Sequence, residues 1–291
     1  MNEAGILLGT SSWTADRWEG SFYPAGTKPQ DFLPVYSNRF NTVEVDSTFY
    51  RIPAARTVEQ WRERTPERFI FAAKIPQLIT HEKVLLDAED DLKVFLKAMD
   101  VLGEKLGPLL FQFPYFNMQK FRGLGFFLER LDPWLANLPK GYQWVVEVRN
   151  KGWPSEKLYS VLRRHSVALA LVDHAWMPRP HEWFENGDPI TADFTFVRWI
   201  GNRKGIEERT KVWNRTLIDR TEELRGWAEV LQVASRRVCA ISGFANNHFG
   251  GFAPDTIEPI RKRWSRAQPR TARKASAPKP PGVHTPRLPG L

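Results

Sequence analysis

Cysteine is almost absent from this sequence, and so are long apolar runs. Cys239 is the only cysteine in 291 residues, which excludes an internal disulfide and every zinc cluster built from several thiolates. We expect it to be buried, because it begins an apolar run. The longest apolar stretches, such as Pro108 to Pro114, are far shorter than the ~20 residues that a transmembrane helix needs. Met1 to Gly9 contains acidic Glu3 and no basic start, so we expect no secretory signal and a cytoplasmic protein without membrane contact.

Acidic residues are fewer than basic ones, and the imbalance is concentrated at one end. The chain has 42 Lys and Arg against 33 Asp and Glu, a net charge of +9. Residues 267–291 hold five of these positive charges, six prolines and no acid, so nine minus five leaves +4 for residues 1–266. Such a composition cannot bury a core, and we predict a disordered basic tail with weak, salt-sensitive attraction to nucleic acid.

Short apolar, β-prone runs alternate with longer helix-like stretches. Most runs are continuously apolar, as parallel strands covered on both faces should be. We predict eight strands, at Ile6 to Gly9, Thr42 to Asp46, Phe69 to Ile75, Pro108 to Phe113, Gln143 to Arg149, Val167 to Val172, Phe194 to Trp199 and Val238 to Gly243. Amphipathic stretches predict helices at Lys28 to Arg39, Thr57 to Arg64, Asp87 to Gly103, Gln119 to Leu138, Ser155 to His165, Glu207 to Arg236 and Pro254 to Arg266. Ala175 to Asp193 is rich in proline and tryptophan and carries no helix pattern, so one helix region is degenerate.

The number and order of these elements favour a closed barrel. Eight strands with a helix after nearly every one, in about 260 residues, are typical of a single (β/α)8 TIM barrel. An open doubly wound sheet would place a glycine-rich phosphate turn after its first strand. Gly9-Thr10-Ser11-Ser12-Trp13 has one glycine and a bulky indole instead. We therefore predict an α/β protein in which residues 1–266 form one TIM barrel.

The ends of the predicted strands carry motifs in the order of one known family. They are Gly9-Thr10-Ser11-Ser12-Trp13, Phe22-Tyr23-Pro24, Val43-Glu44-Val45-Asp46-Ser47-Thr48-Phe49-Tyr50, Lys74 with Thr80-His81, Leu106-Gly107-Pro108 leading to Phe111-Gln112-Phe113-Pro114, Glu147-Val148-Arg149 with Trp153, Arg198 before Gly201, and Ala245-Asn246-Asn247. Through them the chain resembles the YecE-like family, domain of unknown function seventy-two, from Gly5 to Arg266. The resemblance implies a TIM barrel and brings no established activity.

Charged side chains are concentrated where the strands end, which is the functional face of a TIM barrel. Side chains alternate along a strand and the helix-facing side must be apolar, so the following should point into the barrel mouth: Glu44, Asp46, Lys74, Gln112, Glu147, Arg149 and Arg198. One interpretation is an inert ion-pair network that closes the barrel top. The location favours a functional site instead.

The residue types at this mouth suggest a division of labour. Lys74, Arg149 and Arg198 offer donors suited to a phosphate or carboxylate group. Glu44 and Glu147 are the candidate general acid and base, with pKa values separated by unequal exposure and by these cations. Further candidates for contacting a substrate, all placed at or just beyond a strand end, are Asp173, Asn246, His81, Trp13, Trp153 and Tyr50.

A catalytic metal is disfavoured by the spacing of the possible ligands. His81, Glu147, Asp173, His174 and His248 are available, but they form no His-x-His or Glu-x-x-His pattern, and the neighbouring Asp173 and His174 should point apart. The cations at the mouth also oppose a metal. We predict no cofactor.

Three functions fit these observations. The leading one is an enzyme of hydrolase or lyase type that uses acid–base chemistry on a small anionic, phosphate- or sugar-bearing substrate; no dinucleotide motif points to redox chemistry. The second is a nucleic-acid-binding or processing accessory protein, suggested by the isoelectric point of about 9.7 and the basic tail. The third is a barrel that binds a metabolite without turning it over.

Overall fold

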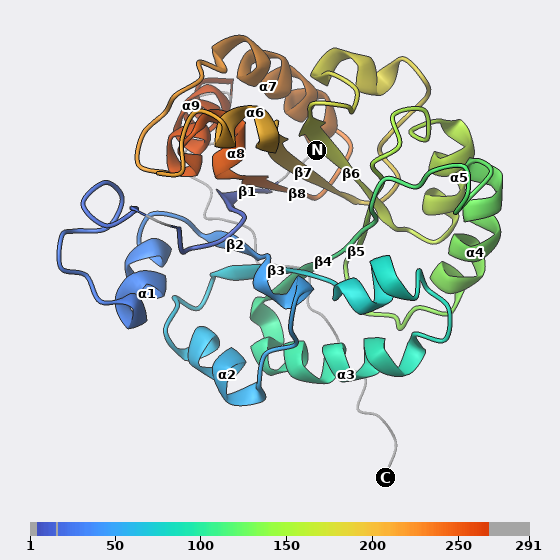
Figure 1. Cartoon of the computed structure of the whole chain (residues 1–291), viewed down its shortest axis with the longest axis horizontal. Coiled ribbons are helices and arrows are strands. Elements are labelled where there is room, and N and C mark those ends of the chain that lie inside the picture. Colours follow the sequence, from blue (N-terminus) through green and yellow to red (C-terminus); the bar gives the residue numbers. More distant parts are fainter. Residues whose placement is uncertain (1–4, 16, 268–291) are drawn as a thin grey trace.

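Eight parallel strands form the centre of the molecule, and helices surround them (Figure 1). The computed structural model describes residues 5–15 and 17–267. The strands are β1 (Gly5–Thr10), β2 (Thr42–Val45), β3 (Ile70–Lys74), β4 (Leu106–Gln112), β5 (Trp144–Glu147), β6 (Ala168–His174), β7 (Phe194–Gly201) and β8 (Ala240–Ala245). Their order in the sheet is β1-β8-β7-β6-β5-β4-β3-β2. The predicted TIM barrel and all eight predicted strands are confirmed, with shifts of one to two residues at most strand ends.

The helices lie on the outside of the barrel, mostly where the hydrophobic pattern places them. They are α1 (Phe32–Ser37), α2 (Ala55–Glu63), α3 (Glu89–Met99), α4 (Leu124–Ala136), α5 (Glu156–Arg164), α6 (Arg203–Glu207), α7 (Thr221–Ser235), α8 (Asn247–Gly250) and α9 (Ala253–Ala267). Between β6 and β7 the chain forms only a short 3₁₀ turn, Pro180–Phe184, which confirms the degenerate helix region. The helix predicted from Glu207 begins at Thr221 instead, and residues 208–220 are irregular.

The seam between β1 and β2, the two ends of the sheet, is joined by a tyrosine. The hydroxyl of Tyr36 accepts the backbone N–H of Thr10 at 2.8 Å and donates to the carbonyl of Thr42 at 3.1 Å. At Gly9 a Cβ atom would lie 2.1 Å from the Thr42 carbonyl oxygen, so only glycine permits this approach. Tyr36, which is fully buried, therefore replaces part of the missing strand ladder.

Two apolar cores are separated by the sheet. The larger fills the space between strands and helices, and the smaller one lies inside the barrel, built from Ala72, Leu110, Val145, Ala168, Ala170, Val172, Phe194, Phe196 and Phe244. The rings of Phe196 and Phe244 are 5.1 Å apart. Because these side chains fill the lower barrel, the charged groups on the same strand faces lie toward its upper end.

Two expectations concern Cys239 and the chain beyond the last helix. Cys239 is exposed rather than buried, because β8 begins one residue later, at Ala240. The last helix ends at Ala267, and the predicted tail beyond it lies outside the described residues. Within residues 5–15 and 17–267, no helix is both long and apolar enough to cross a membrane.

Candidate active site

The charged side chains predicted at the mouth do share the inner face of the barrel. Lys74 pairs in register with Leu110, and Arg198 lies between Val172 and Phe244. Leu110, Val172 and Phe244 belong to the inner core. The strand alternation therefore continues upward from an apolar floor into a charged layer, as the sequence predicts.

Arg198 is the centre of this layer. Its Nη1 donates to Oε2 of Glu147 at 2.8 Å and its Nη2 to Oε1 of Glu44 at 2.6 Å. The side chains of both glutamates are completely buried, and that of Arg198 is 3% exposed. One guanidinium group thus joins β7 to β2 and to β5 across the barrel interior.

Two more cations lie closer to solvent than Arg198. Arg149 donates from Nε to Oε1 of Glu147 at 2.5 Å, and its side chain is 17% exposed. The Nζ of Lys74 lies 3.3 Å from Oδ1 of Asp46 and 3.8 Å from the centre of the Phe49 ring. The mouth therefore presents Lys74, Arg149 and Asp46 above a buried layer of Glu44, Glu147 and Arg198.

The pKa values of the two buried glutamates are shifted in opposite directions. Burial raises the pKa of Glu44, since Arg198 offsets it only in part and Asp46 adds to the rise. Burial acts in the same direction on Glu147, but Arg149 and Arg198 outweigh it and lower the pKa to about 2. The predicted separation by unequal exposure does not apply, because both carboxyl groups are equally buried; the number of neighbouring cations separates them.

The cluster is not self-satisfied. Oε2 of Glu44 and Nε of Arg198 are buried and have no hydrogen-bond partner among the described residues, and neither has Oδ1 of Asp46. Buried polar atoms are nearly always paired, and an orphan carries a free-energy cost of about 1 to 3 kcal/mol. Oδ1 of Asp46 still has its ion pair with Lys74, so the atoms left over are Oε2 of Glu44 and Nε of Arg198, and a network that merely closed the barrel top does not account for them.

Two half-buried histidines lie near the cations. Burial and the positive charges of Lys74 and Arg149 lower the pKa of His81 to about 4. Burial and Arg149 likewise lower the pKa of His174 to about 4. Both imidazoles are therefore neutral near pH 7. Nδ1 of His174 accepts the backbone N–H of Trp176 at 3.4 Å, which leaves Nε2 to carry the proton. From the sequence alone, His174 is a candidate only for metal binding.

Asp173 does not belong to the mouth. Its Oδ2 accepts the indole N–H of Trp227 on α7 at 2.6 Å, so the side chain points outward to the helices, and burial raises its pKa. The expectation that Asp173 and His174 point apart is confirmed. Strand alternation explains it, because Asp173 pairs in register with the outward-facing Trp199.

The remaining candidates divide between packing and exposure. Asn246 caps α8 by accepting the N–H of His248 at 3.0 Å. Trp153 is buried against Phe116 and Phe127, while Trp13 packs edge-on against Trp61. Tyr50 is 69% exposed. Structural contacts thus explain the positions of Trp13, Trp153 and Asn246, whereas Tyr50 is available to a ligand.

The carboxylates at the mouth converge on a guanidinium group. Within the described part of the chain, no three His, Cys, Asp or Glu side chains lie close enough to share a metal ion.

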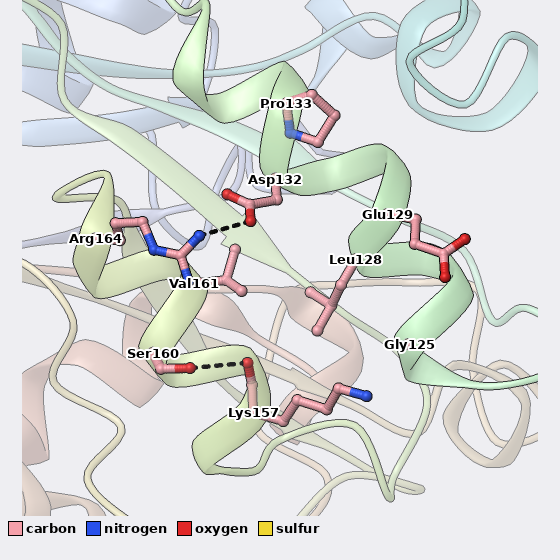
Figure 2. Close-up of a pocket in the computed structure, with 9 residues that line it drawn as sticks. All are labelled: Gly125, Leu128, Glu129, Asp132, Pro133, Lys157, Ser160, Val161 and Arg164. Atoms are coloured by element: carbon pink, nitrogen blue, oxygen red, sulfur yellow. Dashed lines mark hydrogen bonds and ion pairs between the residues drawn. The ribbon is translucent and has the colours of Figure 1, made fainter.

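A surface pocket lies away from this site, between α4 and α5 on the outer ring (Figure 2). Asp132 and Arg164 face each other across it at 2.7 Å, and His165 contacts the other oxygen of Asp132 at 2.6 Å. Asp132 is therefore neutralised by its neighbours within a helix–helix contact.

A parallel barrel with a charged, partly unsatisfied layer under its C-terminal mouth defines a TIM-barrel protein whose functional face is that end. The chain belongs to the family described as "Protein of unknown function DUF72", whose model matches residues 7–281. The match runs beyond Arg266, where the motifs recognised in the sequence end.

Relatives and solved structures agree with this family. The chain is 31% identical over 269 residues to the UPF0759 protein YunF of Bacillus subtilis (strain 168), covering 86% of this chain and 91% of that protein. It is 29% identical over 235 residues to the UPF0759 protein YecE of Escherichia coli (strain K12), covering 73% and 80%. A DUF72 family protein from Thermotoga maritima MSB8 superposes with a TM-score of 0.70 at 28% identity, over 90% of this chain and 99% of that one.

Proposed function

We propose that the protein is an enzyme of hydrolase or lyase type that binds a small phosphate- or sugar-bearing anion in the barrel mouth and exchanges a proton with it. The observation that carries the proposal is the orphaned Oε2 of Glu44, a completely buried carboxyl oxygen in the same cluster as Lys74 and Arg149, the two cations nearer to solvent. A buried acid with a raised pKa and a free oxygen is suited to hold a proton for transfer.

Lys74 and Arg149 are the groups that would hold the anion. Lys74 has Asp46 as its one ion-pair partner among the described residues, and the terminal nitrogens of Arg149 make no hydrogen bond there. A guanidinium edge matches the paired oxygens of a phosphate or carboxylate. An anion that pairs with Lys74 takes the place of Asp46 and opens the way to Glu44.

Glu147 has a different role from Glu44 in this proposal. Both of its oxygens accept guanidinium hydrogen bonds, and its low pKa makes it a poor proton acceptor. It positions Arg149 and Arg198, and it keeps them charged. Glu44 is the proton-exchanging group, and the neutral imidazoles of His81 and His174 donate hydrogen bonds to the ligand.

Anion binding is tested by titrating inorganic phosphate into the protein in a calorimeter. Lys74→Met and Arg149→Met should each weaken binding about tenfold or more, as expected for a charge-assisted contact. Lys97→Met, which removes an exposed cation from α3, is the matched control. Unchanged affinity in both mouth variants contradicts the proposal.

Proton transfer is tested with a panel of nitrophenyl phosphate esters and glycosides. Glu44→Gln should abolish any turnover while phosphate affinity stays within a few-fold of the unchanged protein, because the amide cannot supply a proton. Phosphate binding without turnover of any ester or glycoside would identify a barrel that binds a metabolite without converting it.

A further inference from the structure

The loops after β4 and β5, residues 113–123 and 148–155, form a continuous surface beside the mouth, which we call the platform. The side chain of Asn150 joins them: its Oδ1 accepts the N–H of Phe116 at 3.0 Å, and its Nδ2 donates to the Phe116 carbonyl at 2.8 Å. Beneath this contact Phe116 packs on Trp153, with ring centres 5.8 Å apart. The platform is thus held from within and from below.

Large apolar side chains stand exposed on this platform. Tyr115 is 65% exposed and Met118 is 67% exposed. Asn117 fixes the turn that carries them, since its backbone and side-chain oxygens both accept the N–H of Lys120, at 3.1 and 3.0 Å. An exposed ring on a turn fixed in this way is pre-positioned to stack on a ligand.

The charge of the platform has one sign. Its 19 residues contain Lys120, Arg122, Arg149 and Lys151 and no Asp or Glu. Lys120, Arg122 and Lys151 are exposed and form no ion pair with any described residue. Some cations at other loops of the same face are paired, as in Arg203–Glu207 and Lys83–Asp91. The pKa of Glu182 is lowered by a hydrogen bond from the backbone N–H of Arg179, and the charge of Lys151 helps to lower it. The platform therefore concentrates positive charge next to Arg149 without an acid in its own two loops.

We propose that the platform binds a single-stranded nucleic acid, with a base stacked on Tyr115 and the backbone phosphates along Lys120, Arg122 and Lys151. Exposed aromatic rings interleaved with cations are the usual means of holding a single strand, whose bases are free to stack. In a duplex the base faces are covered, so Tyr115 would gain nothing. The inference deepens the proposed function. It rests on that function only for the step in which the bound strand brings one of its phosphates to Arg149.

The test measures the anisotropy of a short fluorescein-labelled single strand titrated with the full chain at several salt concentrations. Tyr115→Ala should weaken binding about fivefold or more. The triple change Lys120→Glu, Arg122→Glu and Lys151→Glu should weaken binding and reduce the salt slope by about 2, since each phosphate contact on a single strand contributes about 0.7. All these side chains are exposed, so folding is not at stake.

The matched control reverses three exposed cations at the opposite end of the barrel: Arg68→Glu, Lys140→Glu and Arg236→Glu. It changes the net charge equally and keeps residues 268–291 intact, so the platform predicts an unchanged salt slope. The same labelled strand in duplex form should bind more weakly than the single strand.

Three results overturn the inference. They are equal losses in the two triple variants, a Tyr115→Ala affinity within twofold of the unchanged protein, and equal displacement of the strand by polyglutamate at the same charge concentration. Phosphate titration separates this outcome from failure of the proposed function. Lys74-dependent phosphate binding without platform-dependent strand binding refutes the platform alone, and the reverse result refutes the proposed function alone.

Discussion

Replacing Arg198 with methionine removes the one cation that contacts both buried glutamates. Methionine keeps the length of the side chain and supplies no charge. Glu44 then has no hydrogen-bond partner among the described residues, while Glu147 keeps Arg149. Two carboxyl groups without exposed surface must therefore be protonated or remain as poorly compensated buried charges.

The size of the effect follows from the geometry. Breaking a buried ion pair by removing one partner costs about 3 to 5 kcal/mol of unfolding free energy. Arg149 and Arg198 together lower the pKa of Glu147, so the variant loses part of that stabilisation and keeps the part that Arg149 supplies. We expect Arg198→Met to lose about 4 kcal/mol.

The loss should depend on pH in a defined direction. In the unchanged protein the Glu147 contribution is fully present above pH 4.5 and is lost as pH falls toward about 2. In the variant the pKa values of both glutamates rise, so protonation relieves the penalty as pH falls from 7 to 4. The difference in unfolding free energy between the two proteins should therefore be largest at pH 7 and shrink toward pH 4.

Urea unfolding followed by circular dichroism at pH 7 and pH 4 measures both quantities. Arg163→Met, which breaks an exposed pair with Glu156 on α5, is the control and should cost less than about 1 kcal/mol. Adding Glu44→Met and Glu147→Met to the variant should restore stability. A loss below about 1 kcal/mol for Arg198→Met, or one that does not vary with pH, refutes the reasoning.

Three further outcomes follow from the structure. Tyr36→Phe should lower the unfolding free energy by about 2 to 4 kcal/mol in urea titrations, because a backbone donor on β1 and an acceptor on β2 lose their partner. The control is Tyr115→Phe, at a position that is 65% exposed, and equal effects would deny the seam its role. The NMR signals of the His81 and His174 rings should stay constant from pH 8 to about 5.5, since their pKa values lie near 4. The stability that depends on their neutral form is lost as pH falls from 6.5 to 4. An NMR titration midpoint near pH 6.5 for either ring contradicts the prediction. Asp173→Asn should keep the indole hydrogen bond, preserve stability and leave phosphate affinity within twofold; a tenfold loss of affinity would place Asp173 at the site.

The sequence predicts the fold well because parallel strands buried on both faces are read directly from apolar runs. The helix predicted from Glu207 shows where this reasoning ends. Residues 208–220 combine charged side chains with the apolar pairs Val212-Trp213 and Leu217-Ile218. That segment is nevertheless irregular chain before α7, and the N–H groups of Leu217 and Ile218 donate to the Gly250 carbonyl. Periodicity records which residues are apolar, and tertiary contacts decide whether the backbone winds into a helix.

The candidate site shows a similar limit: side-chain directions are predicted well inside strands and poorly beyond their ends. Strand alternation places Glu44, Lys74 and Arg198 correctly because the direction of a side chain inside a strand follows from its position. Beyond the strand ends that rule no longer holds. Trp153, beyond the end of β5, is packed against other rings. His174 lies two residues past the predicted end of its strand at Val172, but β6 continues to His174, so alternation still brings it to the mouth.

The sequence separation between Arg198 and its two partners bears on the order in which the strands of the barrel can pack. Its two buried partners lie 154 and 51 residues earlier in the sequence. Until β7 arrives, β2 and β5 would bring Glu44 and Glu147 into an apolar interior without this cation. The first five strands by themselves therefore leave two buried carboxyl groups without their guanidinium partner, which favours folding of the two halves of the barrel as one cooperative unit.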